Sequence, residues 1–437
     1  MPAPRTTLPW PVVALFTAGY LAPYLLPTVV GRLDAGLPLS ATEAGAVGSA
    51  LLLGSAAAGF LLASRVERIG ARTLARTGLA LAVLGYGGAA LAGDVTAVIA
   101  GAVLGGLGSG TVTTVAATRI AAAPDPHRVS TAGLLGVSAL AAVVYLTVPH
   151  LGAGHGQPLA AIALTALAVW PLTGRLPGRT APGPARRGNR ARLPRLRAGL
   201  VLAAAMPCWS LVQNSLWGVS GRIGLDQAHL GEAGVGAVFA VALGAGLAGV
   251  LGAGMLGARL GRAVPIGAGT VLIAGCVVAS ASATGPVSFA AGEIAWNTLY
   301  PIVLSYLIGL AASLDPRGRW AVLVGSASSL GTAAGPLTGS LLSAWAGFPV
   351  MGLVLGAGLL VVAVPMTAVA VRAGGAAGPV RRGGVPEPRT ADLPPTEIPV
   401  VEIPVVEIAV EGVAVPVRDA YGTAGPRPAA AAPGAGD

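Results

Sequence analysis

Residues 95–118 read VTAVIAGAVLGGLGSGTVTTVAAT, a stretch of apolar and small side chains without a single charge. An α-helix needs roughly 20 such residues to cross the hydrocarbon layer of a bilayer. On either side of this stretch, the first 372 residues divide into runs of similar length, with charged residues between them. The sequence therefore predicts an all-α membrane protein with helices at 10–31, 43–63, 74–93, 95–118, 130–150, 157–174, 198–219, 233–256, 264–284, 287–311, 320–344 and 348–371.

The composition agrees with a membrane protein, since 54% of the 437 residues are hydrophobic and only 10% are charged. The 66 glycines would weaken soluble helices, but small residues allow membrane helices to pack closely. The first run, 10–31, is too long for a cleaved signal peptide. Cys208 and Cys276 lie in apolar runs without metal-ligand spacing, so we interpret them as packing residues and expect no metal site.

All 27 basic residues are arginine. Without lysine, the chain cannot form a phosphate-binding loop of the G-x-x-x-x-G-K-[ST] type or a lysine Schiff base. With the N-terminus inside, only Arg32 and Arg222 fall in outer connections, and the positive-inside rule then places both termini in the cytoplasm. The net charge of +10 reflects this topology, so we expect a multi-pass protein of the bacterial inner (plasma) membrane that contacts the lipid bilayer and binds no nucleic acid.

The charge and proline distribution predicts four regions. The segment 175–197 carries eight arginines and no apolar run, which is typical of a solvated linker that can also touch anionic lipid. The tail repeats Glu-Ile-Pro-Val-Val from Glu397, and its prolines oppose both helix and strand. We therefore predict an N-terminal six-helix bundle at 1–174, a basic cytoplasmic linker at 175–197, a C-terminal six-helix bundle at 198–371 and a disordered cytoplasmic tail at 372–437.

The two halves share short motifs about 190 residues apart. Residues 63–72 read ASRVERIGAR after the second run, and residues 254–262 read GMLGARLGR after the eighth. Asp125-Pro126 follows the fourth run, and Asp315-Pro316 follows the tenth. Each motif lies on the arginine-rich side, which indicates an internal repeat of six helices.

Both loop motifs resemble the G-x-x-x-D-R-x-G-x-[RK] loop of the major facilitator superfamily of transporters, although Glu67, Ala63 and Ala258 depart from it. The resemblance covers 10–371 and implies two six-helix bundles that rock about a central site, usually in a monomer. It also implies a cytoplasmic latch in which Glu67 bonds to the start of the eleventh helix and pairs with Arg119; alternatively, these arginines only fix topology. The implied gate residues are Glu67, Arg68, Gly70, Arg72, Arg119, Arg259, Gly261 and Arg262.

Drug exporters of this family usually carry an arginine in the fourth helix and a G-x-x-x-G-P-x-x-G run in the fifth. Here the fourth helix lacks that arginine, and the run occurs instead in the eleventh helix, at Gly331, Gly335, Pro336 and Gly339. Small residues at this spacing indicate close packing and a bend at the seam between the halves.

In this fold the first, fourth, seventh and tenth helices line the central path, and polar and aromatic residues concentrate there. The tenth helix places Glu293, Trp296, Asn297 and Tyr300 on one face. We predict a substrate cavity formed by Tyr20, Tyr24, Thr114, Gln213, Asn214, Trp217, Glu293, Trp296, Asn297 and Tyr300.

Glu293 is the acid placed most clearly inside an apolar run. An intramembrane carboxylate requires a partner or a proton, so Glu293 is our candidate for proton coupling or for binding a cationic substrate. The alternative is that Glu293 lies near the outer end, hydrated or paired with Arg32 or Arg222. Asp34, Asp94, Asp226 and Glu232 fall in outer loops, where we expect them to be solvated.

Two patterns could suggest an enzyme. Residues 244–249 and 252–257 fit G-x-G-x-x-G, but neither follows a strand, so we interpret both as packing faces of the eighth helix. The four histidines, in loops, form no recognisable triad or metal set. We therefore expect no enzyme activity and no cofactor, with a proton or other ion gradient as the energy source.

The sequence favours a secondary transporter of the drug- or metabolite-efflux type, a proton antiporter that exports an amphipathic small molecule. Proton-coupled uptake of a sugar or an aromatic acid is the alternative within transport, although a sugar site would need more hydrogen-bonding side chains. A different class, a non-transporting receptor or scaffold that acts through its tail, would lose function on deletion of 380–437.

Overall fold

The computed structural model describes residues 9–152, 154–178, 193–256, 260–315 and 318–375. Within these ranges the regular structure is helical and no strand occurs. Arg259, most of the predicted linker and the tail from 376 onward lie outside the described residues. The main helices are α1 (Trp10–Tyr24), α2 (Leu26–Gly36), α3 (Ala41–Leu62), α4 (Val66–Ile69), α5 (Ala71–Leu91), α6 (Val95–Ala121), α7 (Pro126–Thr147), α8 (Gly156–Val169), α9 (Leu196–Arg222), α10 (Glu232–Leu256), α11 (Ala263–Ala281), α12 (Pro286–Leu314) and α13 (Arg319–Gly375).

These helices make a multi-pass membrane protein. Ten helical stretches in the described ranges are long and apolar enough to cross a membrane, and the bent pair α1–α2 is an eleventh. The stretch α13 contains Gly347 in a left-handed conformation (φ 79°), where two helices meet, so it supplies two spans. The twelve predicted spans are therefore present.

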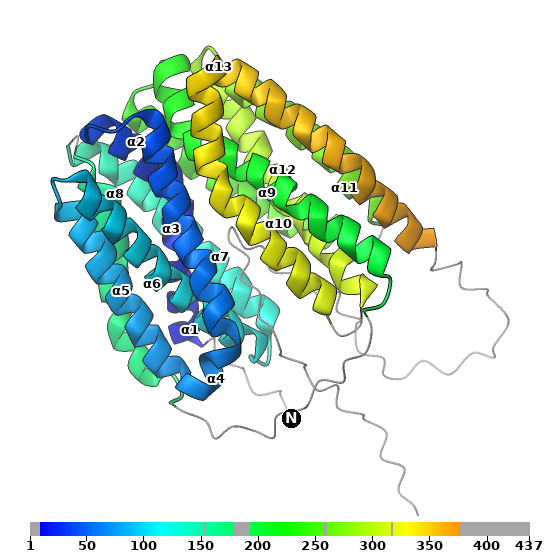
Figure 1. Ribbon diagram of the computed structural model, residues 1–437, viewed down its shortest axis with the longest axis horizontal. Coiled ribbons are helices and arrows are strands. Elements are labelled where there is room, and N and C mark those ends of the chain that lie inside the picture. The colour runs from blue at the N-terminus through cyan, green and yellow to red at the C-terminus, as the bar shows by residue number, and fades with distance from the viewer. Residues whose placement is uncertain (1–8, 153, 179–192, 257–259, 316–317, 376–437) are drawn as a thin grey trace, which may run out of the picture.

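The helices form two halves that lie side by side, α1–α8 in one and α9–α13 in the other (Figure 1). Backbones approach closely where a glycine of one helix faces the backbone of another. Within the first half, a Cβ on Gly106 would collide with the carbonyl of Leu51, and one on Gly110 with the carbonyl of Ser55. Such contacts explain why the chain places glycine inside its membrane helices.

We call the side of the protein at Trp10 the N-terminal side, and the side at Gly36 and Gly347 the opposite side. At the opposite side the halves are in close contact, because a Cβ on Gly45 of α3 would meet Ser340 of α13, and the backbone N–H of Leu337 in α13 bonds to Ser49 Oγ of α3 at 2.9 Å. The ribbons of the two halves diverge toward the N-terminal side (Figure 1).

The first predicted helix, 10–31, differs from the observed one in two respects. It continues to Gly36, and it bends by 47° between Tyr24 and Leu26. Pro27 explains the bend, because proline has no N–H to donate to the carbonyl of residue 23 and its ring crowds that carbonyl.

The internal repeat is visible in matching turns. Gly70 (φ 101°) and Gly261 (φ 64°) both adopt left-handed conformations at the loops after α4 and α10, which explains the glycine in each loop motif. Asp125 caps α7 by accepting the N–H of Arg128 at 2.9 Å. Its counterpart Asp315 accepts from the Arg319 side chain at 2.6 Å.

The glycine-rich run of the eleventh helix was expected to pack at the seam between the halves, but most of it packs within one half. A Cβ on Gly331, Gly335 or Gly339 would collide with α9, a helix of the same half. Only Pro336 reaches across, toward Gly48 of α3. The glycines therefore bind α13 to α9 within the C-terminal half, and the structure records no break in helical geometry at Pro336.

Gly331→Val is expected to prevent folding, because its side chain would overlap the carbonyl oxygen of Pro207 in α9. Overpacking a tight contact costs about 1–3 kcal/mol, and more where backbone must move. The control is Gly309→Val in α12, which meets no heavy atom within 4 Å. Size-exclusion profiles in detergent should show a monodisperse peak for Gly309→Val and loss of it for Gly331→Val; equal profiles would contradict this packing.

Candidate functional site

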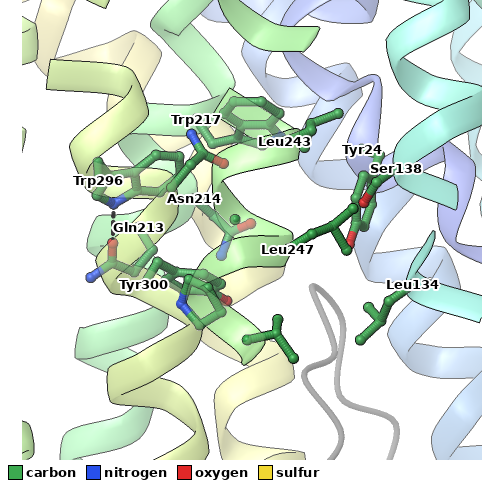
Figure 2. Close-up of a pocket in the computed structure, with 14 residues that line it drawn as sticks. Tyr24, Leu134, Ser138, Gln213, Asn214, Trp217, Leu243, Leu247, Trp296 and Tyr300 are labelled. Atoms are coloured by element: carbon green, nitrogen blue, oxygen red, sulfur yellow. Dashed lines mark hydrogen bonds between the residues drawn. The ribbon is translucent and has the colours of Figure 1, made fainter. Parts of the chain in front are cut away.

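A cavity lies between the two halves (Figure 2). Three of its lining residues come from the N-terminal half and eleven from the C-terminal half. Seven belong to the predicted set: Tyr24, Gln213, Asn214, Trp217, Trp296, Asn297 and Tyr300. The other seven are Leu134, Ser138, Leu243, Gly246, Leu247, Val250 and Pro301.

The predicted residues meet because each group repeats at helical spacing. In α9, Gln213, Asn214 and Trp217 are separated by one, three and four positions, so they share one face of the helix. Trp296 and Tyr300 are four positions apart in α12, so they also share one face of their helix. The two faces converge on the cavity (Figure 2).

Aromatic rings form a continuous row along this wall. The ring centroid of Trp217 lies 5.7 Å from that of Trp296, and Trp296 lies 5.8 Å from Tyr300. Tyr300 stacks on Trp209 at 5.2 Å with an interplanar angle of 14°. Each such pair contributes about 0.5–1.5 kcal/mol beyond its buried area, so the row is a rigid surface suited to an aromatic or apolar ligand.

The indole N–H groups of Trp296 and Trp217 form hydrogen bonds with other groups of the protein. Trp296 Nε1 donates to Gln213 Oε1, and Trp217 Nε1 donates to the carbonyl of Pro23 at 3.1 Å. Asn214 Nδ2 donates to the carbonyl of Ser210 at 2.9 Å. None of the fourteen lining side chains is an acid, an arginine or a histidine. The cavity therefore offers ring faces and a few amide and hydroxyl groups.

Three predicted cavity residues lie elsewhere. Tyr20 packs against Phe16 within the N-terminal half, with ring centroids 4.4 Å apart. Thr114 is fully buried and donates to the carbonyl of Gly110 in its own helix at 2.6 Å. Glu293 is one helical turn behind Trp296 and does not line the cavity. Helical spacing predicted that these residues lie near the central path. It does not determine which half supplies most of the residues that line the cavity.

The lining residues that the sequence did not indicate come mainly from α7 and α10. These are the fifth and eighth spans, which the expected four-helix lining left out. The glycine-rich face of α10 was predicted as a packing surface, and Gly249 does approach the carbonyl of Thr298 in α12. Gly246 on the same helix borders the cavity, so the absence of side chains there also leaves room for a ligand.

Glu293 lies entirely inside the C-terminal half, with no exposed surface. Its Oε1 accepts from Ser220 Oγ of α9 at 3.0 Å and from Ser280 Oγ of α11 at 2.8 Å. Its Oε2 is buried and has no hydrogen-bond partner. The alternative of a hydrated Glu293 paired with Arg32 or Arg222 is wrong for this structure, because both arginines bind other acids.

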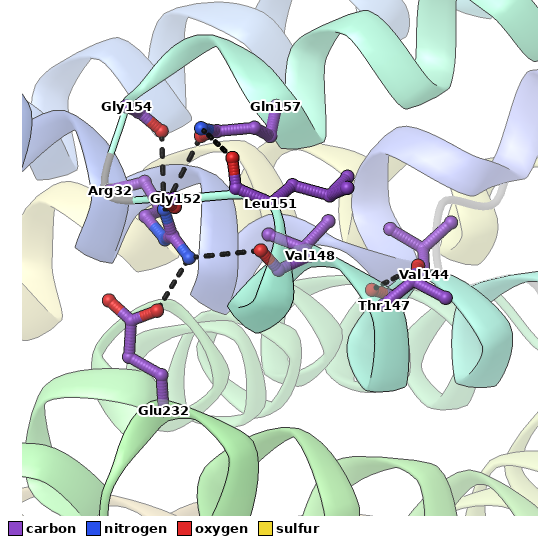
Figure 3. Close-up of polar contacts among 9 residues, drawn as sticks. All are labelled: Arg32, Val144, Thr147, Val148, Leu151, Gly152, Gly154, Gln157 and Glu232. Carbon is purple, nitrogen blue, oxygen red and sulfur yellow. Dashed lines mark hydrogen bonds and ion pairs between the residues drawn. The ribbon is translucent and has the colours of Figure 1, made fainter.

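Arg32 joins the two halves on the opposite side (Figure 3). Its guanidinium is 5% exposed and donates to Glu232 of α10 and to the carbonyls of Val148 and Gly152 at the end of the fifth span. The surrounding carbonyls stabilise the buried cation, and Glu232 supplies the charge from the other half. This pair therefore helps to close the opposite side.

A second ion pair also joins the halves, but here the arginine belongs to the C-terminal half and the acid to the N-terminal half. Arg222 of α9 lies 4.0 Å from Asp34 of α2 and donates to Ser340 Oγ of α13 at 3.2 Å. The expectation that Asp34 and Glu232 are solvated loop acids is therefore wrong. The signal was present in the sequence, because Arg32 and Arg222 are the two arginines of the outer connections and their partner acids lie in the same connections.

The predicted latch on the N-terminal side is not formed in this structure. Glu67 is exposed, whereas Arg119 Nε is buried without a hydrogen-bond partner. Arg72 donates to the carbonyl of Leu176, within the same half, at 2.7 Å and 2.9 Å. The halves diverge on this side, so residues that would meet in a closed state are apart.

The remaining predicted gate residues lie at the same two loops. Gly70 and Gly261 form the turns, while Arg68 and Arg262 are exposed. Within the described part of the chain, no group of three or more histidine, cysteine or acidic side chains could hold a metal ion.

No protein-family model and no curated protein sequence matches the chain. Solved structures do match in fold. A D-xylose-proton symporter superposes with a TM-score of 0.66 at 14% identity, over 81% of this chain and 96% of that one. The peptide transporter POT gives 0.66 at 15% identity, covering 84% and 94%. The human organic anion transporter MFSD10 gives 0.62 at 16% identity, covering 83% and 99%. The chain has the major facilitator fold.

Proposed function

We propose that the protein is a secondary transporter, a proton-coupled exporter of an amphipathic small molecule with an aromatic part. The observation that carries this proposal is the row of aromatic rings in a cavity between two halves of a transporter fold. Such a surface favours apolar and planar groups over heavily hydroxylated ones. The absence of a basic side chain among the fourteen lining residues disfavours an aromatic acid, and the small number of polar groups disfavours a sugar.

The proposed transport cycle uses the two closures in turn. The N-terminal side is assigned to the cytoplasm by the arginine distribution. With the opposite side closed by Arg32 and Glu232, cargo would enter the cavity from the cytoplasm. Closing the N-terminal side, with Glu67 near Arg119, would then accompany opening of the opposite side in alternating access. The same geometry would serve an importer that releases its cargo, and the sign of the proton gradient that drives movement distinguishes the two directions.

Proton coupling is assigned to Glu293. An ionised carboxylate with an unpartnered buried oxygen would be strongly disfavoured in this environment, so we assign the protonated form to the state described here. For an exporter the proton must move inward, so Glu293 would bind it while the opposite side is open to water and release it toward the cytoplasm in the state open on the N-terminal side. Ser220 links the carboxyl to α9, the helix that also carries Gln213 and Trp217 of the cavity.

The experiment is transport in liposomes with a proton gradient of either sign, using naphthylamine, 2-naphthamide, 2-naphthoate and D-xylose as cargo. We expect gradient-driven movement of naphthylamine or naphthamide, and a tenfold or greater loss with Trp296→Ala, since an aromatic contact contributes on the order of 1 kcal/mol beyond its buried area. Trp345→Ala is the control, because Trp345 is 84% exposed and does not line the cavity. Movement of xylose or naphthoate alone would refute the proposal in favour of uptake, and no movement of any compound would refute transport of this class.

A further inference from the structure

The bend between α1 and α2 leaves a buried backbone carbonyl without its helical partner, next to the cavity residue Tyr24. In a continuous helix the carbonyl of Pro23 would accept the N–H of residue 27, four positions on. Residue 27 is a proline and has no N–H. The N–H of Leu25 is directed at this carbonyl but is shared with the carbonyl of Leu21, to which it bonds at 3.0 Å. A buried carbonyl requires a full donor, so the sequence itself creates a demand for one at Pro23.

Trp217 of the other half supplies that donor. Its Nε1 donates to the Pro23 carbonyl at 3.1 Å, and both groups are buried. From the N-terminal half, Tyr145 Oη donates to the neighbouring carbonyl of Tyr24. The two carbonyls at the bend are thus held from both halves, and the Trp217 bond must break when the end of α1 and α9 separate.

Trp217 also belongs to the cavity wall. Its ring centroid lies 5.7 Å from Trp296 on the cavity side and 5.2 Å from Phe239 of α10. Phe239 in turn contacts Tyr145, with centroids 5.1 Å apart. A ligand that stacks on the Trp217 ring therefore touches the same side chain that holds the broken helix.

We propose that Trp217 is a positioning residue that connects the cavity to closure of the opposite side, through its hydrogen bond to the Pro23 carbonyl. A ligand that moves the indole by even one ångström lengthens this bond, because hydrogen bonds weaken steeply with distance and angle. Cargo binding and release of the opposite side then become linked. This inference rests on the proposed function only for the cargo; the hydrogen bond and its effect on closure can be tested without any ligand.

The test compares Trp217→Phe with Trp296→Phe. Both substitutions keep an aromatic ring in the wall and remove one indole N–H. The Trp217 N–H bonds to the other half, whereas the Trp296 N–H bonds to Gln213 in its own half. Trp296→Phe is therefore a matched control for ring size and for the general effect of removing a buried donor.

Closure is measured as the distance between nitroxide labels at Leu151→Cys and Trp345→Cys, which are exposed positions on the opposite side of the two halves. The background carries Cys208→Ala and Cys276→Ala, which removes the native thiols. In detergent without ligand, we expect Trp217→Phe to raise the long-distance, open population about fivefold, the effect of one net hydrogen bond. Trp296→Phe should leave the distribution as in the parent protein.

A second variant tests the same bond from the carbonyl side. Pro27→Ala restores an N–H that can bond to the Pro23 carbonyl within the helix, so the demand for Trp217 disappears. We expect Pro27→Ala to open the opposite side as well, and the double variant to open it no further than the stronger single variant.

Three results would overturn the inference: an unchanged distribution in Trp217→Phe, the same shift in both tryptophan variants, or additive shifts in the Pro27→Ala and Trp217→Phe pair. A shift in Trp217→Phe supports it even if none of the naphthyl compounds is transported, so its failure and that of the proposed function are separate outcomes. Size-exclusion and circular dichroism profiles of each variant establish that the compared proteins are folded.

Discussion

Glu293→Gln is expected to abolish proton-driven accumulation of cargo while leaving ligand exchange across the membrane intact. Glutamine has the same shape and can still accept from Ser220 and Ser280, the two hydroxyls that bind Oε1. It cannot bind or release a proton, so the step that ties cargo to the gradient is lost. Because Glu293 does not line the cavity, cargo affinity should stay close to that of the parent protein.

The measurement is a pair of assays on the same proteoliposomes, uphill accumulation under a proton gradient and counterflow exchange without one. Asp94→Asn is the matched control, since Asp94 is an acid whose carboxylate caps α6 through Ala97 N–H at 3.1 Å and asparagine caps equally well. Retention of uphill accumulation in Glu293→Gln would contradict the assignment. Loss of exchange as well would show that Glu293 acts in binding or folding instead of coupling.

Arg32→Ala is expected to have the second large effect, a shift of the protein toward the state open on the opposite side. The substitution leaves Glu232 and three backbone carbonyls without their shared donor. Breaking a buried ion pair costs about 3–5 kcal/mol. Glu232 is 41% exposed, so water recovers part of this, and we expect about 2 kcal/mol, a shift of more than tenfold in population.

The label pair at Leu151→Cys and Trp345→Cys reports this shift as growth of the long-distance population. Asp34→Asn is the control, because Asp34 and Arg222 are 4.0 Å apart and Arg222 keeps its bonds to Ser340 and Ser343. Its effect should stay below about 1 kcal/mol, because the 4.0 Å separation is at the limit of an ion pair. Equal shifts in the two variants would mean that loss of either ion pair between the halves opens the protein, and that the Arg32 cluster has no special role in closure.

The sequence predicted the fold because membrane helices are local. A helix in lipid must satisfy its backbone hydrogen bonds within itself, so residues 95–118 alone predict a span, and α6 covers it. Left-handed turns are also local, which is why the glycines of the two loop motifs, Gly70 and Gly261, were recognisable as a repeat. The bend at Pro27 follows from one residue, although its angle depends on how α2 packs.

The sequence predicted those cavity residues whose position depends only on their spacing along one helix. Trp296, Asn297 and Tyr300 share a face whatever their neighbours, and the cavity lies on that face. Glu293 shares the spacing but lies a turn away, against α9 and α11. No periodicity within α12 distinguishes a side chain that meets a cavity from one that meets another helix.

The sequence by itself determined the twelve spans, the two related halves and the aromatic faces of α9 and α12, because each follows from hydrogen bonding and periodicity within one segment. Only the tertiary structure decided that Glu293 is enclosed by serines, that Arg32 meets Glu232 and that Trp217 reaches the Pro23 carbonyl. These contacts join residues 73, 200 and 194 positions apart. The pairings of Arg32 and Trp217 depend on how the two halves close against each other, and that of Glu293 depends on how α9, α11 and α12 pack within one half. Local sequence preferences carry no information about either arrangement.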